Sequence, residues 1–525
     1  MSASRVVLAW LALASISGSA AYSQAKAPAA GSGAAPASAD AEDAEDAAAS
    51  KAARPLVAPV DPKARVQWLR DRVAAAIAGE PRLGRARIGV SVVDLATGNE
   101  LINHDADKAM SLASNAKLLT STTALADLGA GFRWRTSVLG AEPDDKGVVA
   151  GDLIVRGRGD PTLEAADLNA LAADVAARGV RQIDRLVLDT SYFDDAVEPP
   201  RFDDQPRETA GFRAPVASLG VARSAVTVTV IAEPGGAATV ALDPDAGDYV
   251  RVTTRELVSV ATGRTKIKVD VKAKADHMEL TVSGQIRWGE GSWDIRKRVA
   301  DPARFAAEVF RRALLDHGVK IKVKGFARGQ APAAAKLLAA HDSAALGDVL
   351  RHMNKSSDNY VAESLFKTVG AETKAAPGPA TWNDARDAER AYLARIGLPA
   401  ASYRAENGSG LFDATEVSAR QLTTVLAAAH KDFRVGPELA ASLPIGGVDG
   451  TLARRWLGHA AKGRVRAKTG TLNQVVTIAG YVAVDGQHPI AVAVLVNDIP
   501  AGQRAGARTA ADEIIDALIA YLGTP

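Results

Sequence analysis

The 525-residue sequence contains no cysteine. This absence excludes disulfide bonds, thiolate metal ligands and a cysteine nucleophile together. The sequence also lacks an excess of charge of either sign, since 63 basic and 61 acidic side chains leave a net charge of +2. A nearly neutral chain presents no broad cationic surface to a polyanion, so we expect no nucleic acid partner. The eight histidines form no His-Glu-x-x-His pattern, and we expect neither a metal nor a cofactor.

Hydrophobic runs long enough to span a membrane are also missing. The apolar stretch "VVLAWLALA", which follows Arg5, is too short, and small residues follow it in "SISGSAAYSQA". A charged start, a short apolar stretch and a small-residue cleavage region are typical of a secretory signal. We predict a signal peptide over residues 1–25, export to the periplasm, and a mature protein without a transmembrane segment. An uncleaved N-terminal anchor is the alternative.

Beyond the signal, composition divides the chain into further parts. Residues 26–62 are rich in Ala, Pro, Gly and acidic residues and predict a disordered linker, because such a segment buries too little apolar surface to fold. Residues 63–138 and 336–525 combine helical patterns with strand-like runs, two in "RIGVSVVDLATGNELINHD" and three in "RVRAKTGTLNQVVTIAGYVAVDGQHPIAVAVLVND". Residues 139–335 instead contain alternating runs such as "SAVTVTVIAE" and "KIKVDVK", which favour half-exposed antiparallel strands. We therefore predict one domain in two segments, interrupted by a strand-rich insertion.

The spacing Ser-x-x-Lys places both side chains on one face of a helix, where a lysine can activate a serine. It occurs at three places: Ser23/Lys26, Ser114/Lys117 and Ser364/Lys367. The first pair falls in the processing region. The third lies in the body of an apparent helix, where we interpret it as a solvated serine and lysine. The second begins a nearly uncharged helix, "NAKLLTSTTALADLG", and is the candidate for chemistry.

Two later motifs favour the pair Ser114/Lys117 over the other two pairs. In chain order the three motifs are Ser114-Asn-Ala-Lys117, Ser357-Asp358-Asn359 and Lys468-Thr469-Gly470. Each is weak alone, but the set is the signature of penicillin-recognising serine acyltransferases. An acyl transfer needs a nucleophile, a base, a proton relay, an oxyanion hole and an anchor for the substrate. The three motifs together offer all of these.

Ser114 supplies the nucleophilic hydroxyl, and Lys117 is the nearest general base. A free lysine is protonated at neutral pH, so Lys117 must be desolvated or lie near another cation to act. Lys468 is the candidate for that cation. Lys468 and Thr469 are also the candidates for binding a substrate carboxylate.

The remaining motif residues complete the expected site. Ser357 is a candidate relay that carries a proton to the leaving amine, and Asn359 is able to hold both the base and the substrate amide. Gly470 allows the substrate backbone to approach the strand. The backbone N–H groups of Ser114 and Thr471 are the expected oxyanion hole.

With these motifs in place, the chain resembles the D-alanyl-D-alanine carboxypeptidases and DD-endopeptidases of the class C low-molecular-mass penicillin-binding proteins. The similarity spans nearly all of the expected folded region and includes "LASNAKLLTSTTALADLGAGFRWRT", "MNKSSDNYVAESLFK", "ENGSGLF" and "AKTGTLNQVVTIAGYV". The most specific feature is the long separation between Ser114 and Ser357, because most relatives carry these two motifs much closer together.

The resemblance implies an α+β fold, in which a transpeptidase-like domain with an antiparallel sheet packed against helices is interrupted by further domains. It implies cleavage of peptidoglycan stem peptides at the terminal D-Ala-D-Ala bond, and often at cross-links, with β-lactams as covalent inhibitors. Two positions depart from the pattern. Asp413 stands where some members carry an arginine near the diaminopimelate side chain, and Asn473 stands where a glutamine can occur. The oligomeric state is open.

Two other functions compete with this interpretation. A β-lactamase of the same fold needs a group that activates the deacylating water, and the segment "EAADLN" (164–169) is one residue too long and precedes Ser357. We interpret that segment as a surface helix. A non-catalytic wall-binding module is the second alternative, and the retention of Ser114, Lys117 and Lys468 speaks against it.

Overall fold

The computed structural model describes residues 56–524. The predicted signal peptide and most of the predicted linker lie outside the described residues. The first described helix, α2 (Pro62–Ala78), begins with a proline and is capped by Asp61, whose side chain accepts a hydrogen bond from the backbone N–H of Ala64. No helix in the described part of the chain is both long enough and apolar enough to cross a membrane.

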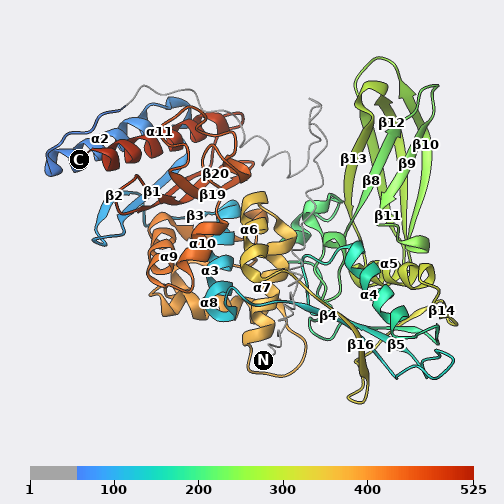
Figure 1. The fold of residues 1–525 in the computed structure, drawn as a ribbon. Coiled ribbons are helices and arrows are strands. Elements are labelled where there is room, and N and C mark those ends of the chain that lie inside the picture. Colours follow the sequence, from blue (N-terminus) through green and yellow to red (C-terminus); the bar gives the residue numbers. More distant parts are fainter. Residues whose placement is uncertain (1–55, 525) are drawn as a thin grey trace, which may run out of the picture. The chain divides into compact units, whose positions relative to one another are not determined.

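A five-stranded antiparallel sheet is formed by strands from the two ends of the described chain (Figure 1). Its strands, in spatial order, are β19 (Val465–Leu472), β20 (Val475–Val482), β21 (Ile490–Asn497), β1 (Arg87–Asp94) and β2 (Glu100–His104). Alternate residues of β21 belong to different apolar clusters. Val492 and Val494 pack with α2 and α11 (Arg504–Gly523), whereas Ala491 and Leu495 pack with α9 (Ala419–Lys431). The two-residue period of the strand thus places helices on both faces of the sheet.

Further helices pack in the same apolar cluster as α9. They are α3 (Ala116–Leu128), α6 (Leu346–Ser356), α7 (Asn359–Thr373), α8 (Trp382–Arg395) and α10 (Gly436–Ser442). Helix α3 is buried from Ala116 to Leu125. Its buried threonines satisfy their hydroxyls locally, because Thr122 and Thr123 each donate to the backbone carbonyl of Leu119. A small sheet joins β17 (Arg404–Ala405), β18 (Thr415–Ser418) and β3 (Ala109–Ser111).

The chain enters and leaves the predicted insertion through two paired strands. Strand β4 (Arg135–Gly140) is antiparallel to β16 (Lys336–Asp342), and Arg135 forms an ion pair with Asp342 at 2.6 Å. The same sheet contains β5 (Leu153–Arg156), β7 (Leu186–Asp189) and β15 (Phe326–Arg328), with β7 parallel to both of the others. A parallel pair links β6 (Gln182–Ile183) to β14 (Lys320–Ile321).

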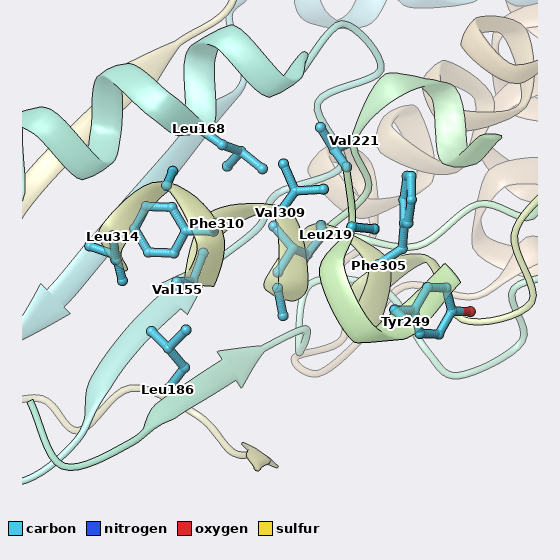
Figure 2. Packing of buried hydrophobic residues seen from close by; sticks show 14 of the residues in the cluster. Val155, Leu168, Leu186, Leu219, Val221, Tyr249, Phe305, Val309, Phe310 and Leu314 are labelled. Atoms are coloured by element: carbon cyan, nitrogen blue, oxygen red, sulfur yellow. The ribbon is translucent and has the colours of Figure 1, made fainter. Parts of the chain in front are cut away.

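Helices α4 (Ala165–Ala177) and α5 (Pro302–Asp316) pack on this sheet. Figure 2 shows Phe310 and Leu314 of α5 between Leu168 of α4 and Val155 of β5. Two three-stranded sheets share the same apolar cluster. They contain β8 (Ala225–Ala232), β9 (Ala238–Asp243), β13 (Ser292–Arg298), β10 (Val250–Val260), β11 (Lys266–Ala273) and β12 (Met278–Arg287).

The expectation that these strands are antiparallel is correct for β8 with its two neighbours and for β11 with β12. It is wrong for β10, which runs parallel to β12. The alternating pattern indicates that one face of a strand is exposed and carries no information on the direction of its neighbour. The overall fold is α+β, as expected.

Candidate active site

The first motif lies on a tight turn that leads into α3. Ser114 is part of a short 3₁₀ turn, Ala113–Asn115, and Lys117 is in the first turn of the α-helix that follows. Lys117 is fully buried, whereas Ser114 is partly exposed. The side-chain amide of Asn115 donates to Thr477 Oγ1 at 2.7 Å, and this bond attaches the turn to strand β20.

The second motif forms the corner between α6 and α7. Ser357 ends α6 in the left-handed conformation, with φ of 60°. Asp358 caps α7, because its carboxylate accepts the backbone N–H of Val361 at 3.0 Å, and Asn359 is the first residue of that helix. Burial raises the pKa of Asp358, but a hydrogen bond from His352 and the charge of Arg223 outweigh it and hold the pKa below the ordinary value.

The third motif lies on β19, an edge strand of the five-stranded sheet. The backbone N–H of Ala467 points away from the sheet and donates to the carbonyl of Pro444. Backbone N–H groups of alternate residues in an antiparallel strand face the same side. The N–H groups of Thr469 and Thr471 therefore also point to the outer edge of the strand, where an extended substrate is able to pair with them.

Two lysine–serine pairs meet at the corner between α6 and α7. Lys117 Nζ donates to Ser114 Oγ at 3.0 Å and to Asn359 Oδ1 at 2.7 Å. Lys468 Nζ donates to Ser357 Oγ at 2.9 Å. Ser357 and Asn359 are separated by one residue, so the corner holds a partner for each lysine. Both lysines are fully buried, which places two amines in a desolvated setting beside hydroxyls.

Gly470 brings the third motif against the first. A Cβ atom at this position would lie 2.4 Å from Thr477 Oγ1, 2.7 Å from the carbonyl oxygen of Leu112 and 3.0 Å from the backbone nitrogen of Ser114. These contacts leave no room for a side chain. The absence of a side chain therefore allows strand β19 to lie directly beside the serine turn.

The buried carboxyl group of Glu363 helps to position Lys117 through a loop that contacts both. Glu363, one turn after Asn359 on α7, accepts the backbone N–H groups of Gly408 and Ser409 at 3.0 and 2.8 Å. The carbonyl of Ser409 in turn accepts a hydrogen bond from Lys117 Nζ at 3.2 Å. Burial raises the pKa of Glu363, and the hydrogen bonds that it accepts oppose that change.

The structure thus brings together Ser114, Lys117, Asn359, Lys468 and Ser357. Thr469 follows Lys468 on β19, and its hydroxyl forms a hydrogen bond with that of Thr451 at 2.8 Å. Asn473 lies apart from this group of contacts, exposed in the turn between β19 and β20. Asp413 is also exposed, and its carboxylate accepts a hydrogen bond from the hydroxyl of Ser111 at 2.6 Å.

The expectation for the third Ser-x-x-Lys pair is wrong. Ser364 and Lys367 are both fully buried on α7 rather than solvated. Ser364 donates to the carbonyl of Gly159, and Lys367 forms an ion pair with Asp194 at 2.6 Å. The ammonium group of Lys367 also lies 4.5 Å from the ring centre of Trp382. This pair joins α7 to the inserted region, and its lysine is directed to a carboxylate instead of its serine.

Sequence reasoning missed Glu363 and the support that Asn115 receives from Thr477. The signal for Glu363 was its spacing of four from Asn359, which places both on one helix face. A charged side chain on an apolar, buried helix face normally has a buried partner. The partner of Asn115 lies on a distant strand, and no local pattern indicates it.

Comparison with known proteins agrees with this geometry. The model of the D-Ala-D-Ala carboxypeptidase 3 (S13) family matches residues 69–518. A D-alanyl-D-alanine carboxypeptidase of Actinomadura sp. (strain R39) is 35% identical over 439 residues, which cover 80% of this chain and 79% of that protein. A second relative, the D-alanyl-D-alanine carboxypeptidase DacB of Haemophilus influenzae, is 27% identical over 77% of this chain and 84% of its own length.

Among solved structures, penicillin binding protein 4 from Haemophilus influenzae superposes with a TM-score of 0.69 at 24% identity and covers 86% of this chain and 99% of that chain. At this level of identity the likeness shows the fold. The match over 69–518, together with the relative at 35% identity, shows the family. The chain is an enzyme that belongs to the D-Ala-D-Ala carboxypeptidase 3 (S13) family.

Proposed function

We propose that the protein is a serine-type D-alanyl-D-alanine carboxypeptidase that forms an acyl-enzyme on Ser114 and also cleaves D-alanyl cross-links in peptidoglycan. The observation that carries the proposal is the pair of buried lysines, one 3.0 Å from the hydroxyl of Ser114 and the other 2.9 Å from that of Ser357. Sequence relatives named as D-alanyl-D-alanine carboxypeptidases support the substrate class.

In the first step, Ser114 Oγ attacks the carbonyl carbon of the penultimate D-alanine, and Lys117 Nζ accepts the hydroxyl proton. Lys117 acts as a base only when it is neutral, and its complete burial favours the neutral form. The N–H groups of Ser114 and Thr471 stabilise the developing oxyanion. Asn359, which accepts a hydrogen bond from Lys117, fixes the position of the base.

In the second step, the C–N bond breaks and Ser357 passes its proton to the leaving amine. The proton that Lys117 took from Ser114 restores the hydroxyl of Ser357, so that Lys117 is neutral again. Lys468 and Thr469 hold the terminal carboxylate of the substrate, whose backbone pairs with the outer edge of β19. Water then attacks the ester and neutral Lys117 takes its proton. As the bond between the acyl carbon and Ser114 Oγ breaks, Lys117 returns that proton to Oγ and the hydroxyl is restored. A β-lactam enters the same first step, but its leaving group stays attached to the acyl chain.

A fluorescent penicillin tests this assignment. We expect a stable adduct on the wild type and none on Ser114→Ala, and we expect turnover of a D-Ala-D-Ala peptide to fall by about 10⁶-fold in that variant. Ser364→Ala is the matched control, because this serine precedes a lysine by the same spacing and donates to the carbonyl of Gly159 instead. An adduct retained in Ser114→Ala would refute the assignment, whereas rapid turnover of penicillin by the wild type would indicate the β-lactamase alternative.

We also propose the division into a catalytic domain, residues 63–138 and 336–525, and an insertion, residues 139–335. The pairing of β4 with β16, through which the chain leaves and returns, supports these limits. The signal-like start of the sequence supports export to the periplasm. A structure of the Haemophilus influenzae protein described as complexed with a novel β-lactam supports β-lactams as inhibitors.

The balance between terminal cleavage and cross-link cleavage depends on how the site accepts the substrate side chain. We propose that Asn473, exposed beside β19, contacts that side chain. The carboxylate of Asp413 reverses the charge expected there, and its hydrogen bond with Ser111 fixes its position. Mass spectrometry of products from cross-linked and uncross-linked muropeptides measures the balance directly.

A further inference from the structure

A left-handed turn in the inserted region lies against the second motif. Ala222, Arg223 and Ser224 have successive φ values of 51°, 56° and 49°. Residues other than glycine rarely adopt this conformation, and almost never three in succession. The turn follows Leu219 and Val221, which are buried in the apolar cluster that Figure 2 shows. Strain of this kind persists only where the surrounding structure holds it, and it is most common at functional sites.

The turn presents two side chains to the corner between α6 and α7. Arg223 Nε lies 2.9 Å from Asp358 Oδ2, and both side chains are mostly buried. Ser224 Oγ forms a hydrogen bond with the hydroxyl of Tyr360 at 3.2 Å. Asp358 and Tyr360 are the residues on either side of Asn359. The turn therefore holds both chain neighbours of the residue that binds Lys117.

Other contacts restrict the guanidinium group further. Its terminal nitrogens lie 3.3 Å from Glu164 Oε1 and 3.3 Å from His352 Nε2. His352 also lies 3.5 Å from Asp358 Oδ2. This histidine is exposed on α6. Together these groups fix Arg223 between the insertion and the motif. Its terminal nitrogens contact Glu164 and His352, and its Nε lies beside the capping carboxylate as an ion pair without a hydrogen bond.

We infer that Arg223 is a positioning residue for the acyl transfer: by holding Asp358, it sets the geometry of Ser357 and Asn359. The inference rests on the proposed function, which gives those two residues their roles. Asp358 caps α7 and follows a residue in the left-handed conformation, so a shift of its carboxylate changes the backbone on both sides. The insertion thereby contributes a residue that positions the groups of the catalytic site.

The test compares Arg223→Gln with the wild type in the full chain. We expect the rate constant for acylation by a fluorescent penicillin to fall by about 10- to 100-fold, as small displacements of catalytic groups typically cost. With a D-Ala-D-Ala peptide the loss should appear in kcat more than in KM, because the affected groups act on the reacting amide. Arg223→Lys keeps the charge without the planar fork, and we expect an intermediate rate.

Arg311→Gln is the matched control. Arg311 forms an ion pair with Glu308, within α5 of the same insertion, that is somewhat more buried than the pair of Arg223 with Asp358. We expect this variant to acylate at the wild-type rate, while both glutamine variants have similar melting temperatures. Should Arg223→Gln fail to fold, Ser224→Ala takes its place, because it removes the hydrogen bond to Tyr360 without leaving a charge. A smaller but measurable loss of acylation rate is then expected.

Two results separate this inference from the proposed function. A wild type that penicillin acylates at Ser114, combined with an unchanged acylation rate in both Arg223→Gln and Ser224→Ala, would overturn the inference alone. A wild type that penicillin does not acylate would overturn both. Equal losses in Arg223→Gln and Arg311→Gln would show that the insertion acts only through overall stability, which also contradicts a positioning role.

Discussion

At the scale of single residues, Glu389 is a buried carboxyl group that senses the charge of Glu363, the residue that holds the loop bound by Lys117. Glu389 of α8 is 3% exposed. Burial, with a smaller contribution from the charge of Glu363, raises its pKa to about 8. Glu389 is therefore neutral in the folded protein at neutral pH. In the unfolded chain it ionises at its ordinary pKa, and this difference makes the stability of the fold depend on pH.

The substitution Glu389→Gln removes this contribution to the pH dependence of stability, because glutamine does not ionise. As pH rises from about 4.5 to about 8, the unfolded chain loses this proton and the folded protein keeps it, so the wild type becomes less stable. A pKa difference of this size is worth on the order of 5 kcal/mol. We expect the variant to melt at a higher temperature than the wild type at pH 8 and at the same temperature at pH 4.5. Thermal denaturation across this pH range measures the difference, with the exposed Glu233→Gln as control. A gain that does not grow with pH would contradict the assignment.

The motif residues could be predicted because each motif follows a local rule. Ser114 and Lys117 share one face of a helical start, and Asp358 is a typical capping residue. Glu363 and Arg223 were missed for a different reason. Their partners, the loop at 408–409 and the corner at Asp358, are brought to them only by tertiary structure.

At the scale of elements, the contact between strand β19 and the serine turn decides whether the site is assembled. A Cβ atom added at Gly470 would lie within 3.0 Å of three groups, among them the backbone nitrogen of Ser114. Since backbone atoms cannot move independently of their strand, a side chain here would displace β19 from the turn. The same displacement would shift Lys468, two residues earlier on the strand, away from Ser357.

Gly470→Ala is therefore expected to lower the acylation rate by about 100-fold or more, because it separates the reacting groups. Penicillin acylation kinetics measure the loss. The control is Gly289→Ala, since no atom outside its chain neighbours lies within 4 Å of the Cβ position at Gly289. That variant should react as the wild type does. Normal acylation in Gly470→Ala would mean that β19 approaches the turn less closely than the structure shows.

Elements with strong local signals were predicted well. The nearly uncharged stretch that begins at Asn115 was predicted as a helix and matches α3, which is buried from Ala116 to Leu125. The direction of β10 could not be predicted, because parallel pairing with β12 depends on contacts across the sheet and not on the alternation within a strand. For the same reason the spatial order of the strands was outside the reach of sequence patterns.

At the scale of the whole molecule, the insertion is tied to α7 by two buried ion pairs with different consequences. Arg223 reaches the corner at Asp358, at the start of the helix. Lys367 lies two helical turns farther along and pairs with Asp194 of the insertion, between the rings of Trp382 and Phe193. Burial lowers the pKa of Lys367, and the carboxylate of Asp194 opposes this change. The first pair contacts the motif, whereas the second contacts only the body of the helix.

Asp194→Ala should therefore affect stability and not catalysis. It leaves Lys367 fully buried without its carboxylate, and removal of one partner from a buried pair costs about 3 kcal/mol. We expect the melting temperature to fall by several degrees, while the acylation rate by penicillin stays within about twofold of the wild type, as for a distant and independent site. Arg223→Gln should instead show a large loss of rate, with a fall in melting temperature similar to that of Arg311→Gln, since each of these variants removes one partner of a mostly buried pair. If Asp194→Ala instead slows acylation as strongly, the whole interface between the insertion and α7, and not the turn at 222–224, controls the site.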